Sequence, residues 1–158
     1  MAAKYYFITR WQIRAPVEDV WDAIYDSLSW PQWWKGVKAA RSLEEGDERG
    51  INGVREYTWQ SVLPYQLRFS SKLLEREDYK RLHGVADGDL QGEGTWHFYE
   101  KDGVTYLQYD WKVSTNLKWM NRFSFLLKPL FRYNHDVVMK WGAKGLARKL
   151  NAELLSWK

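Results

Sequence analysis

The sequence predicts an α+β fold in which a bent antiparallel sheet wraps around a long C-terminal helix. Three observations lead to this class: a first strand is followed by two short helical segments, the middle of the chain is a run of strands, and helical spacing returns after Asn116. No repeat or low-complexity linker divides the 158 residues, so we expect a single domain over 1–158.

The first strand is predicted over residues 4–15, where aromatic and β-branched side chains alternate with polar ones. Pro16 then begins a helix over about 16–27, with acidic residues in its first turn, where the helix dipole favours them. A second proline, Pro31, begins a short helix over about 31–35. This helix contains most of SWPQWW, and we expect its first role to be holding the first helix against the sheet edge.

The middle of the chain consists of short alternating runs separated by turn residues. KDG joins the last two runs and is a hairpin signal. The glycine-rich DGDLQGEG, residues 87–94, is expected to be a loop or bulged turn. Strands are predicted over residues 37–43, 54–60, 65–77, 81–86, 95–100 and 104–113.

The C-terminal segment has helical spacing, and Pro129 is expected to divide a short lead-in helix from a long one that reaches about residue 154. Gly142 and Gly145 lie inside the long helix, although each costs about 1 kcal/mol relative to Ala. Such glycines indicate close approach of another backbone. One face of this helix is a stripe that consists of Phe131, His135, Val138, Met139, Gly142, Leu146 and Leu150.

Composition excludes several classes of protein. Cysteine is absent, which excludes a disulfide framework, a Cys-ligated zinc site and a thiol nucleophile. The N-terminal sequence has no long apolar run, and no stretch approaches the roughly 18 apolar residues of a membrane span. We therefore expect a cytoplasmic protein without a secretory signal or transmembrane segment. The net charge of +4 permits an anionic partner without requiring one, and nothing in the sequence sets an oligomeric state.

The aromatic content is the most informative feature, since eleven Trp, ten Tyr and six Phe make up 17% of the chain. A solid aromatic core is one explanation, and a concave site walled by rigid rings is the other. Strand parity directs one set of rings toward the concave side of the sheet, facing the last helix. The residues expected to line a cavity are Trp11, Tyr57, Trp59, Phe69, Trp96, Phe98, Tyr109, Trp111, Phe131, His135 and Met139.

Trp34 is the residue expected at the cavity rim. Trp30 and Trp33 are three positions apart and can share a buried side, whereas Trp34 turns about 100° away from them. Tyr57 and Tyr109 could orient the polar end of a ligand, because a buried phenol needs a hydrogen-bond partner.

His135 is the candidate catalytic residue, because a histidine facing an apolar cavity can act as an acid or a base. The alternative is a core histidine bonded to a nearby carbonyl. Together with His83 and His97 it forms no local metal-ligand pattern, so neither a metal nor another cofactor is expected.

The last helix also contains a row of basic residues, which we interpret as a solvated face, with contact to an anionic membrane surface as the alternative. Nucleic acid is not an expected partner, because the aromatic residues fall on the concave face and not among the basic ones. The row consists of Lys128, Arg132, Lys140, Lys144, Arg148 and Lys149.

Three stretches together resemble a known family. RAPVEDVWDAIYDSLSWPQWW, DGDLQGEGTWHF and VVMKWGAKGLARKL are similar, in this order, to the polyketide cyclase/dehydrase-like branch of the START-like, birch-pollen-allergen-like (SRPBCC) superfamily. The resemblance implies a helix-grip fold with an internal hydrophobic cavity. It also implies binding of lipids, sterols, polyketides or other apolar small molecules, with a minority of cyclases, but no universal catalytic residue set.

Three functions follow from these expectations. The first is binding of an apolar or aromatic small molecule, such as a lipid or a polyketide-like compound, between the sheet and the last helix. The second is a cyclase or dehydrase acting on a bound carbonyl compound through His135 or a cavity tyrosine. The third is a lipid-surface or protein-interaction module that uses the basic helix and exposed tryptophan.

Overall fold

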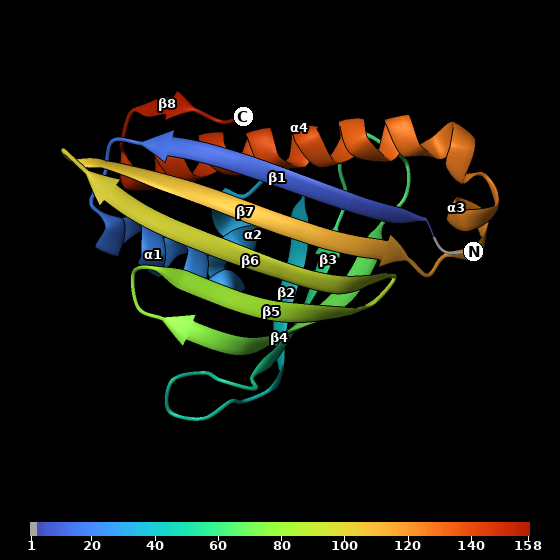
Figure 1. Cartoon of the computed structure of the whole chain (residues 1–158), viewed down its shortest axis with the longest axis horizontal. Coiled ribbons are helices and arrows are strands. Elements are labelled where there is room, and N and C mark those ends of the chain that lie inside the picture. The colour runs from blue at the N-terminus through green and yellow to red at the C-terminus, as the bar shows by residue number, and fades with distance from the viewer. Residues whose placement is uncertain (1–2) are drawn as a thin grey trace.

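A strongly curved antiparallel sheet and a long helix on its concave side make up the fold in the computed structural model, which describes residues 3–158 (Figure 1). The eight strands follow the order β2-β3-β4-β5-β6-β7-β1-β8. This is the helix-grip arrangement that the sequence predicts. The elements are β1 (Lys4–Ile13), α1 (Val17–Tyr25), α2 (Trp30–Trp33), β2 (Val37–Glu44), β3 (Val54–Trp59), β4 (Leu67–Glu77), β5 (Arg81–Gly88), β6 (Leu90–Lys101), β7 (Val104–Thr115), α3 (Lys118–Arg122), α4 (Ser124–Leu150) and β8 (Leu154–Ser156).

Strand β1 illustrates how the sequence alternation positions the core. It pairs with β7 along its whole length, from Lys4 opposite Ser114 to Ile13 opposite Thr105. Its odd-numbered residues are buried, while most even-numbered ones face solvent, as the alternation predicts. The concave side therefore collects the rings of one parity from each strand, and α4 covers them.

The two glycines of α4 allow α2 to pack directly on this helix. A Cβ at Gly142 would collide with the indole of Trp34, and one at Gly145 would collide with the backbone carbonyl oxygen of Trp33. The close approach expected from the sequence is confirmed. The indole Nε1 of Trp34 also donates a hydrogen bond of 2.9 Å to the carbonyl oxygen of Val138 on α4.

Of the two expectations for residues 87–94, a loop or a bulged turn, the structure has a turn, because β5 ends at Gly88 and β6 begins at Leu90 in one long hairpin. Gly88 and Gly92 have φ values of +128° and +156°, which glycine adopts without strain and which allow a tight turn followed by an irregular strand start. The carboxylate of Asp89 accepts a hydrogen bond of 2.9 Å from the backbone N–H of Arg68 and ties the turn to β4.

The boundaries of the last helix also differ from expectation. Pro129 does not divide it, because this proline lies near the start of α4 and removes only one backbone hydrogen bond there; the break comes earlier, at Phe123. The helix ends at Leu150 rather than near 154, because Asn151 adopts a left-handed conformation with φ of 51°. The chain then forms the short edge strand β8. Among residues 3–158, no helix combines the length and apolar character needed to cross a membrane.

Candidate ligand pocket

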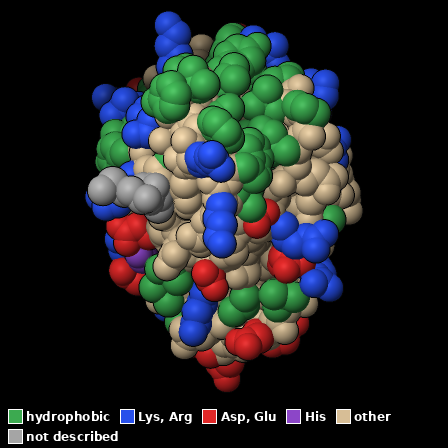
Figure 2. All heavy atoms as spheres, turned by 90° about the vertical axis from the view of Figure 1, so that its right-hand side faces the viewer, with side chains coloured by type: hydrophobic (Ala, Val, Ile, Leu, Met, Phe, Trp, Pro, Cys, Tyr) green, Lys and Arg blue, Asp and Glu red, His purple; other side chains and the backbone are tan. Residues whose placement is uncertain are grey.

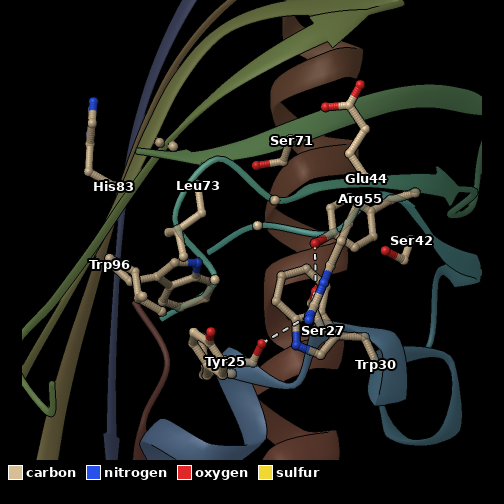
Figure 3. A pocket seen from close by; sticks show the side chains of 18 of the residues that line it. Tyr25, Ser27, Trp30, Ser42, Glu44, Arg55, Ser71, Leu73, His83 and Trp96 are labelled. Carbon is tan, nitrogen blue, oxygen red and sulfur yellow. Dashed lines mark hydrogen bonds between the residues drawn. The ribbon is translucent and has the colours of Figure 1, made fainter. Parts of the chain in front are cut away.

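An outer pocket of about 340 Å³ lies between the concave side of the sheet, the end of α1 and the β2–β3 connection (Figure 3). Its sheet wall is built from residues of one parity, which strand geometry directs to the same face. Trp30 of α2 and Ile24 of α1 close it from the helical side. The large side chains that line it from the sheet are Tyr57, Trp59, Phe69, Leu73, Leu82, Trp96, Tyr109 and Trp111.

Arg55 brings a positive charge into this pocket. Its Nη1 donates to the Ser27 hydroxyl at 2.8 Å and to the Tyr25 carbonyl oxygen at 3.2 Å (Figure 3). The Tyr57 hydroxyl donates to the same Ser27 oxygen at 2.7 Å, and burial raises the pKa of this phenol. Among the described residues Arg55 makes no ion pair. Its remaining N–H groups can therefore donate to an oxygen of a bound molecule.

The β2–β3 connection gives the pocket an acidic border. Glu44, Glu45, Asp47 and Glu48 all contribute to the lining. The Asp47 carboxylate accepts backbone hydrogen bonds from residues 49 and 51 at 2.8 and 2.9 Å, which orders the turn. The four carboxylates at the border disfavour the entry of a negatively charged molecule. The guanidinium of Arg55 inside the pocket is a hydrogen-bond donor for an oxygen of a neutral molecule.

A smaller inner pocket of about 80 Å³ continues toward α4. Phe131, Asn134, His135, Val138 and Met139 line it from the helix. The two pockets adjoin, because six side chains border both of them. These shared residues are Trp30, Trp59, Phe69, Trp96, Tyr109 and Trp111.

Several polar atoms at the inner pocket are buried without a hydrogen-bond partner among the described protein groups. They are the indole Nε1 atoms of Trp30 and Trp59, the Oδ1 of Asn134 and both ring nitrogens of His135. An unsatisfied buried polar group costs about 1–3 kcal/mol, so native proteins satisfy most of them. This wall thus offers both donors and an acceptor to a polar group that reaches it.

Tyr109 lies where the two pockets meet. Its ring stacks on Trp96 with centroids 4.3 Å apart, and Gly94 on the neighbouring strand leaves the room that the phenol occupies. Burial raises the pKa of this phenol, with the nearby Tyr57 as a smaller cause, so Tyr109 is neutral at physiological pH. The hydroxyl makes no side-chain hydrogen bond among the described residues and remains available to a bound molecule.

His135 is held in the inner wall by stacking. Its ring lies 3.9 Å from the ring of Phe7, centroid to centroid, with the planes 11° apart. Burial lowers the pKa of His135 below its ordinary value, and the carboxylate of Asp136, 3.8 Å from Nδ1, is the smaller and opposing cause. Among the described residues, no carbonyl oxygen forms the hydrogen bond to His135 that the alternative of a core histidine requires. His135 is therefore a neutral imidazole facing an apolar space.

This environment predicts a pH dependence of stability. Because the folded-state pKa lies below 6.5, the unfolded chain binds the proton first as the pH falls. The contribution of the neutral histidine to the free energy of unfolding is fully present above about pH 6.5. Below this pH the contribution declines by at most about 1.4 kcal/mol per pH unit. Urea unfolding at about pH 7 and about pH 5.5 measures this effect. Between these two pH values, we expect the free energy of unfolding of His135→Leu to fall by about 1 kcal/mol less than that of the wild type. His97→Leu, at a half-exposed position, is the control, and equal pH slopes for His135→Leu and wild type would contradict the prediction.

The structure places nine of the eleven residues expected at the cavity in the lining of the two pockets. Trp11 and Phe98 lie elsewhere on the concave face and belong to the core. The Trp11 ring packs against Trp34 and Trp96 at 5.6 and 5.7 Å, and Phe98 packs against Trp21 at 5.0 Å. Strand parity correctly predicts that both side chains point to the concave side. They line no pocket, because α1 and α2 cover this part of the sheet. The nine pocket residues are Tyr57, Trp59, Phe69, Trp96, Tyr109, Trp111, Phe131, His135 and Met139.

The expected rim position of Trp34 is wrong. Its side chain is only 2% exposed and lines the inner pocket between α4 and the sheet, away from any rim. Helical spacing describes how Trp34 turns relative to Trp30 and Trp33, but the slot beside Gly142 is what receives it. All three tryptophans of SWPQWW are buried.

Sequence reasoning missed the polar part of the pocket. Arg55 has the same strand parity as Tyr57 and Trp59, and that signal could have revealed it. Ser27 carried no signal, because it begins a single 3₁₀ turn (Ser27–Ser29) after α1 and reaches the pocket only through the fold. His83 borders the pocket, yet Figure 3 shows its side chain directed away, where Nδ1 lies 2.7 Å from the Thr95 hydroxyl oxygen. Within residues 3–158, no cluster of three or more His, Asp or Glu side chains could hold a metal.

The curved antiparallel sheet, the long C-terminal helix and the pocket between them define a helix-grip protein with an internal pocket. The family model described as polyketide cyclase/dehydrase and lipid transport matches residues 8–155, and the chain belongs to this family. A comparison with curated proteins finds no matching sequence.

Several solved structures share the fold at low sequence identity. TTHA0849 from Thermus thermophilus is 17% identical with a TM-score of 0.73, covering 92% of this chain and 99% of its own. A START superfamily protein from Mycobacterium smegmatis is 14% identical with a TM-score of 0.70, covering 95% and 97%. The Zhui aromatase/cyclase from a Streptomyces species is 13% identical with a TM-score of 0.68, covering 93% and 96%. At such identities the comparison establishes the fold alone.

Proposed function

We propose that this protein binds an aromatic small molecule that carries carbonyl or hydroxyl oxygens, in the space between the sheet and α4. The observation that carries the proposal is the aromatic-walled pocket of about 340 Å³ that contains Arg55, which makes no ion pair among the described residues. This volume lies within the roughly 300–1,000 Å³ of small-molecule sites. Membership in a family of polyketide cyclases and lipid transporters supports the same class of ligand.

The ring geometry supports a flat ligand. The ring of Tyr109 is nearly parallel to those of Trp96 and Trp111, with interplanar angles of 27° and 23°, and the ring of Trp30 is nearly parallel to that of Tyr57, at 19°. Such parallel ring faces favour another ring system offset above them. A long-chain fatty acid fits less well, because its flexible chain loses more entropy on binding and its carboxylate meets the acidic border.

The polar groups support oxygens on the ligand. Arg55 can donate to a carbonyl oxygen in the outer pocket, and the Tyr109 hydroxyl can donate where the pockets meet. The indole Nε1 groups of Trp30 and Trp59 are further donors deeper inside. An oxygen-bearing aromatic compound satisfies these donors, whereas a pure hydrocarbon leaves them unpaired.

Fluorescence of N-phenyl-1-naphthylamine, a neutral aromatic probe, tests the proposal. We expect saturable binding with a stoichiometry of one, and displacement by 1,8-dihydroxyanthraquinone at a concentration at least about tenfold lower than palmitate requires. Native mass spectrometry of the anthraquinone complex checks the stoichiometry. An Arg55→Met variant should bind the anthraquinone more weakly while retaining the probe. If neither the naphthylamine probe nor the anthraquinone binds, the proposal is wrong. If palmitate displaces the probe at a lower concentration than the anthraquinone does, the ligand class is fatty acids and not aromatic compounds.

An enzyme of the cyclase or dehydrase type is the second candidate, and His135 is the observation that favours it. A neutral imidazole with two unpartnered nitrogens at an apolar pocket can remove a proton next to a ligand carbonyl. Incubation with an aromatic poly-β-ketone analogue, followed by mass spectrometry for loss of water, tests this activity. Equal conversion by wild type and His135→Ala excludes the role of His135.

A further inference from the structure

A cluster of exposed apolar side chains covers one end of the molecule. Their exposed fractions run from 43% for Trp119 to 76% for Phe125. Figure 2 shows an apolar surface at the top of this end, with Lys and Arg side chains around it and the acidic side chains mainly in the lower half. Isolated exposed apolar residues are common, but a contiguous group indicates an interaction surface. The members, here called the apolar platform, are Trp119, Phe123, Phe125, Leu126, Leu130 and Tyr133.

Four of the six platform residues lie on the outer face of α4, the same helix that lines the inner pocket. Phe131 and Asn134 of α4 turn inward and are buried. Leu126, Leu130 and Tyr133, spaced by four and three residues, form a stripe that is 47–60% exposed. The first part of α4 is therefore apolar on both faces, although no described element covers the outer one. Packing inside the domain does not account for this outer stripe.

The chain segment that carries the platform has charge of a single sign. Residues 111–135 contain five basic residues and no Asp or Glu, although the whole chain has twenty acidic residues. Lys128 and Arg132 lie over the ring of Tyr5, at 5.9 and 5.8 Å from its centroid, on the flank of α4. Arg122 lies 5.7 Å from the ring centroid of Phe123. The apolar side chains are thus flanked by cations.

We propose that the apolar platform docks this protein onto an anionic lipid surface. Large apolar and aromatic side chains can enter the boundary between headgroups and acyl chains, while flanking Lys and Arg side chains meet the anionic headgroups. A second copy of the chain is a poor occupant, because it brings the flanking Lys and Arg side chains of two copies together. The proposal goes beyond ligand binding and does not depend on it, since the platform side chains point away from the pocket.

Co-sedimentation with vesicles tests the docking. We expect the full chain to bind vesicles of phosphatidylcholine mixed with phosphatidylglycerol at low salt, and to bind pure phosphatidylcholine vesicles about tenfold more weakly. High salt should weaken the first binding. The double variant Phe125→Ser/Leu126→Ser should lower the partition coefficient for mixed vesicles by at least about tenfold. Its probe binding and melting temperature should match those of the wild type, because both side chains are exposed.

Two matched controls distinguish docking through the apolar platform from nonspecific adsorption to vesicles. Tyr99→Ser removes an aromatic side chain that is 61% exposed on β6 and should bind mixed vesicles like the wild type. Lys118→Glu/Arg122→Glu should weaken binding at least about tenfold, whereas Lys38→Glu/Lys101→Glu, with the same change in net charge, should have a much smaller effect. Failure to bind mixed vesicles at low salt, or wild-type binding by the Phe125→Ser/Leu126→Ser variant, overturns the proposal. A dimer in light scattering that this variant dissociates also overturns it, in favour of a second copy.

Discussion

Trp34→Ala is expected to lower the free energy of unfolding by about 4 kcal/mol, the usual cost of deleting a fully buried tryptophan. The Trp34 ring is the centre of the aromatic core, with the rings of Trp11, Trp30 and Trp59 between 5.0 and 5.6 Å away. It also donates the hydrogen bond to Val138 on α4. The substitution leaves a cavity beside Gly142 and separates α2 from α4. Urea unfolding followed by circular dichroism gives the measurement.

Two further variants identify the cause of this loss. Trp34→Phe keeps a ring but removes the indole N–H, and we expect it to cost about half as much as Trp34→Ala. Trp119→Ala deletes the same side chain from a position that is 43% exposed and should cost less than about 1 kcal/mol. A Trp34→Ala variant as stable as Trp119→Ala would show that the α2–α4 contact does not contribute to stability.

Ser71→Trp is expected to reduce the affinity for N-phenyl-1-naphthylamine by at least about a hundredfold. Ser71 lies on β4 with the parity of Phe69 and Leu73, and Figure 3 shows its side chain directed into the pocket. An indole at this position occupies much of the pocket volume and covers the aromatic wall. The variant should remain folded, because the new side chain fills space that the pocket already provides.

Ser70→Trp is the matched control for this prediction. Ser70 is the preceding residue on β4 and points to the opposite face of the sheet, so the same indole is added outside the pocket. Titration of both variants with the probe, and calorimetric melting of both, separates occlusion from misfolding. If Ser71→Trp melts like Ser70→Trp and still binds the probe as the wild type does, the probe binds somewhere else.

Helix α4 connects the two proposals of function. Its inner face carries His135 and Met139 at the inner pocket, and its outer face carries the platform residues Leu126 and Leu130. The same helix thus contributes to a small-molecule site and to a candidate lipid-docking surface. The probe titration and the vesicle experiment test these faces separately, because the proposed variants change one face at a time.

Much of the fold could be predicted from local patterns. Alternation along β3 and β4 predicted that Tyr57 and Phe69 point to the same side, and the glycines of α4 predicted its close contact with another segment. These predictions succeeded because side-chain direction in a strand or helix depends on the positions of neighbouring residues alone. The length of the β5–β6 hairpin was underestimated for a local reason too, since glycine-rich sequence is typical of both loops and irregular strands.

Trp34 shows what local patterns cannot predict. Its helical position suggested a side different from that of Trp30, and the rim was a reasonable expectation. The structure buries it because Gly142, more than a hundred residues later, leaves room for an indole and Val138 provides an acceptor. A side chain is buried or exposed according to what packs on it, and the packing partner is set by the whole chain.

By itself, the sequence determined the order of the elements up to α4, the face on which each ring lies and the family resemblance. Parity, helical spacing and capping are short-range effects, so they can be read along the chain. The tertiary structure decided which concave-face rings border open space and which are core, as Trp96 and Trp11 show. It also brought Ser27 to Arg55 and left the outer face of α4 uncovered. These outcomes depend on where α1, α2 and α4 cover the sheet, and that coverage is a property of long-range packing.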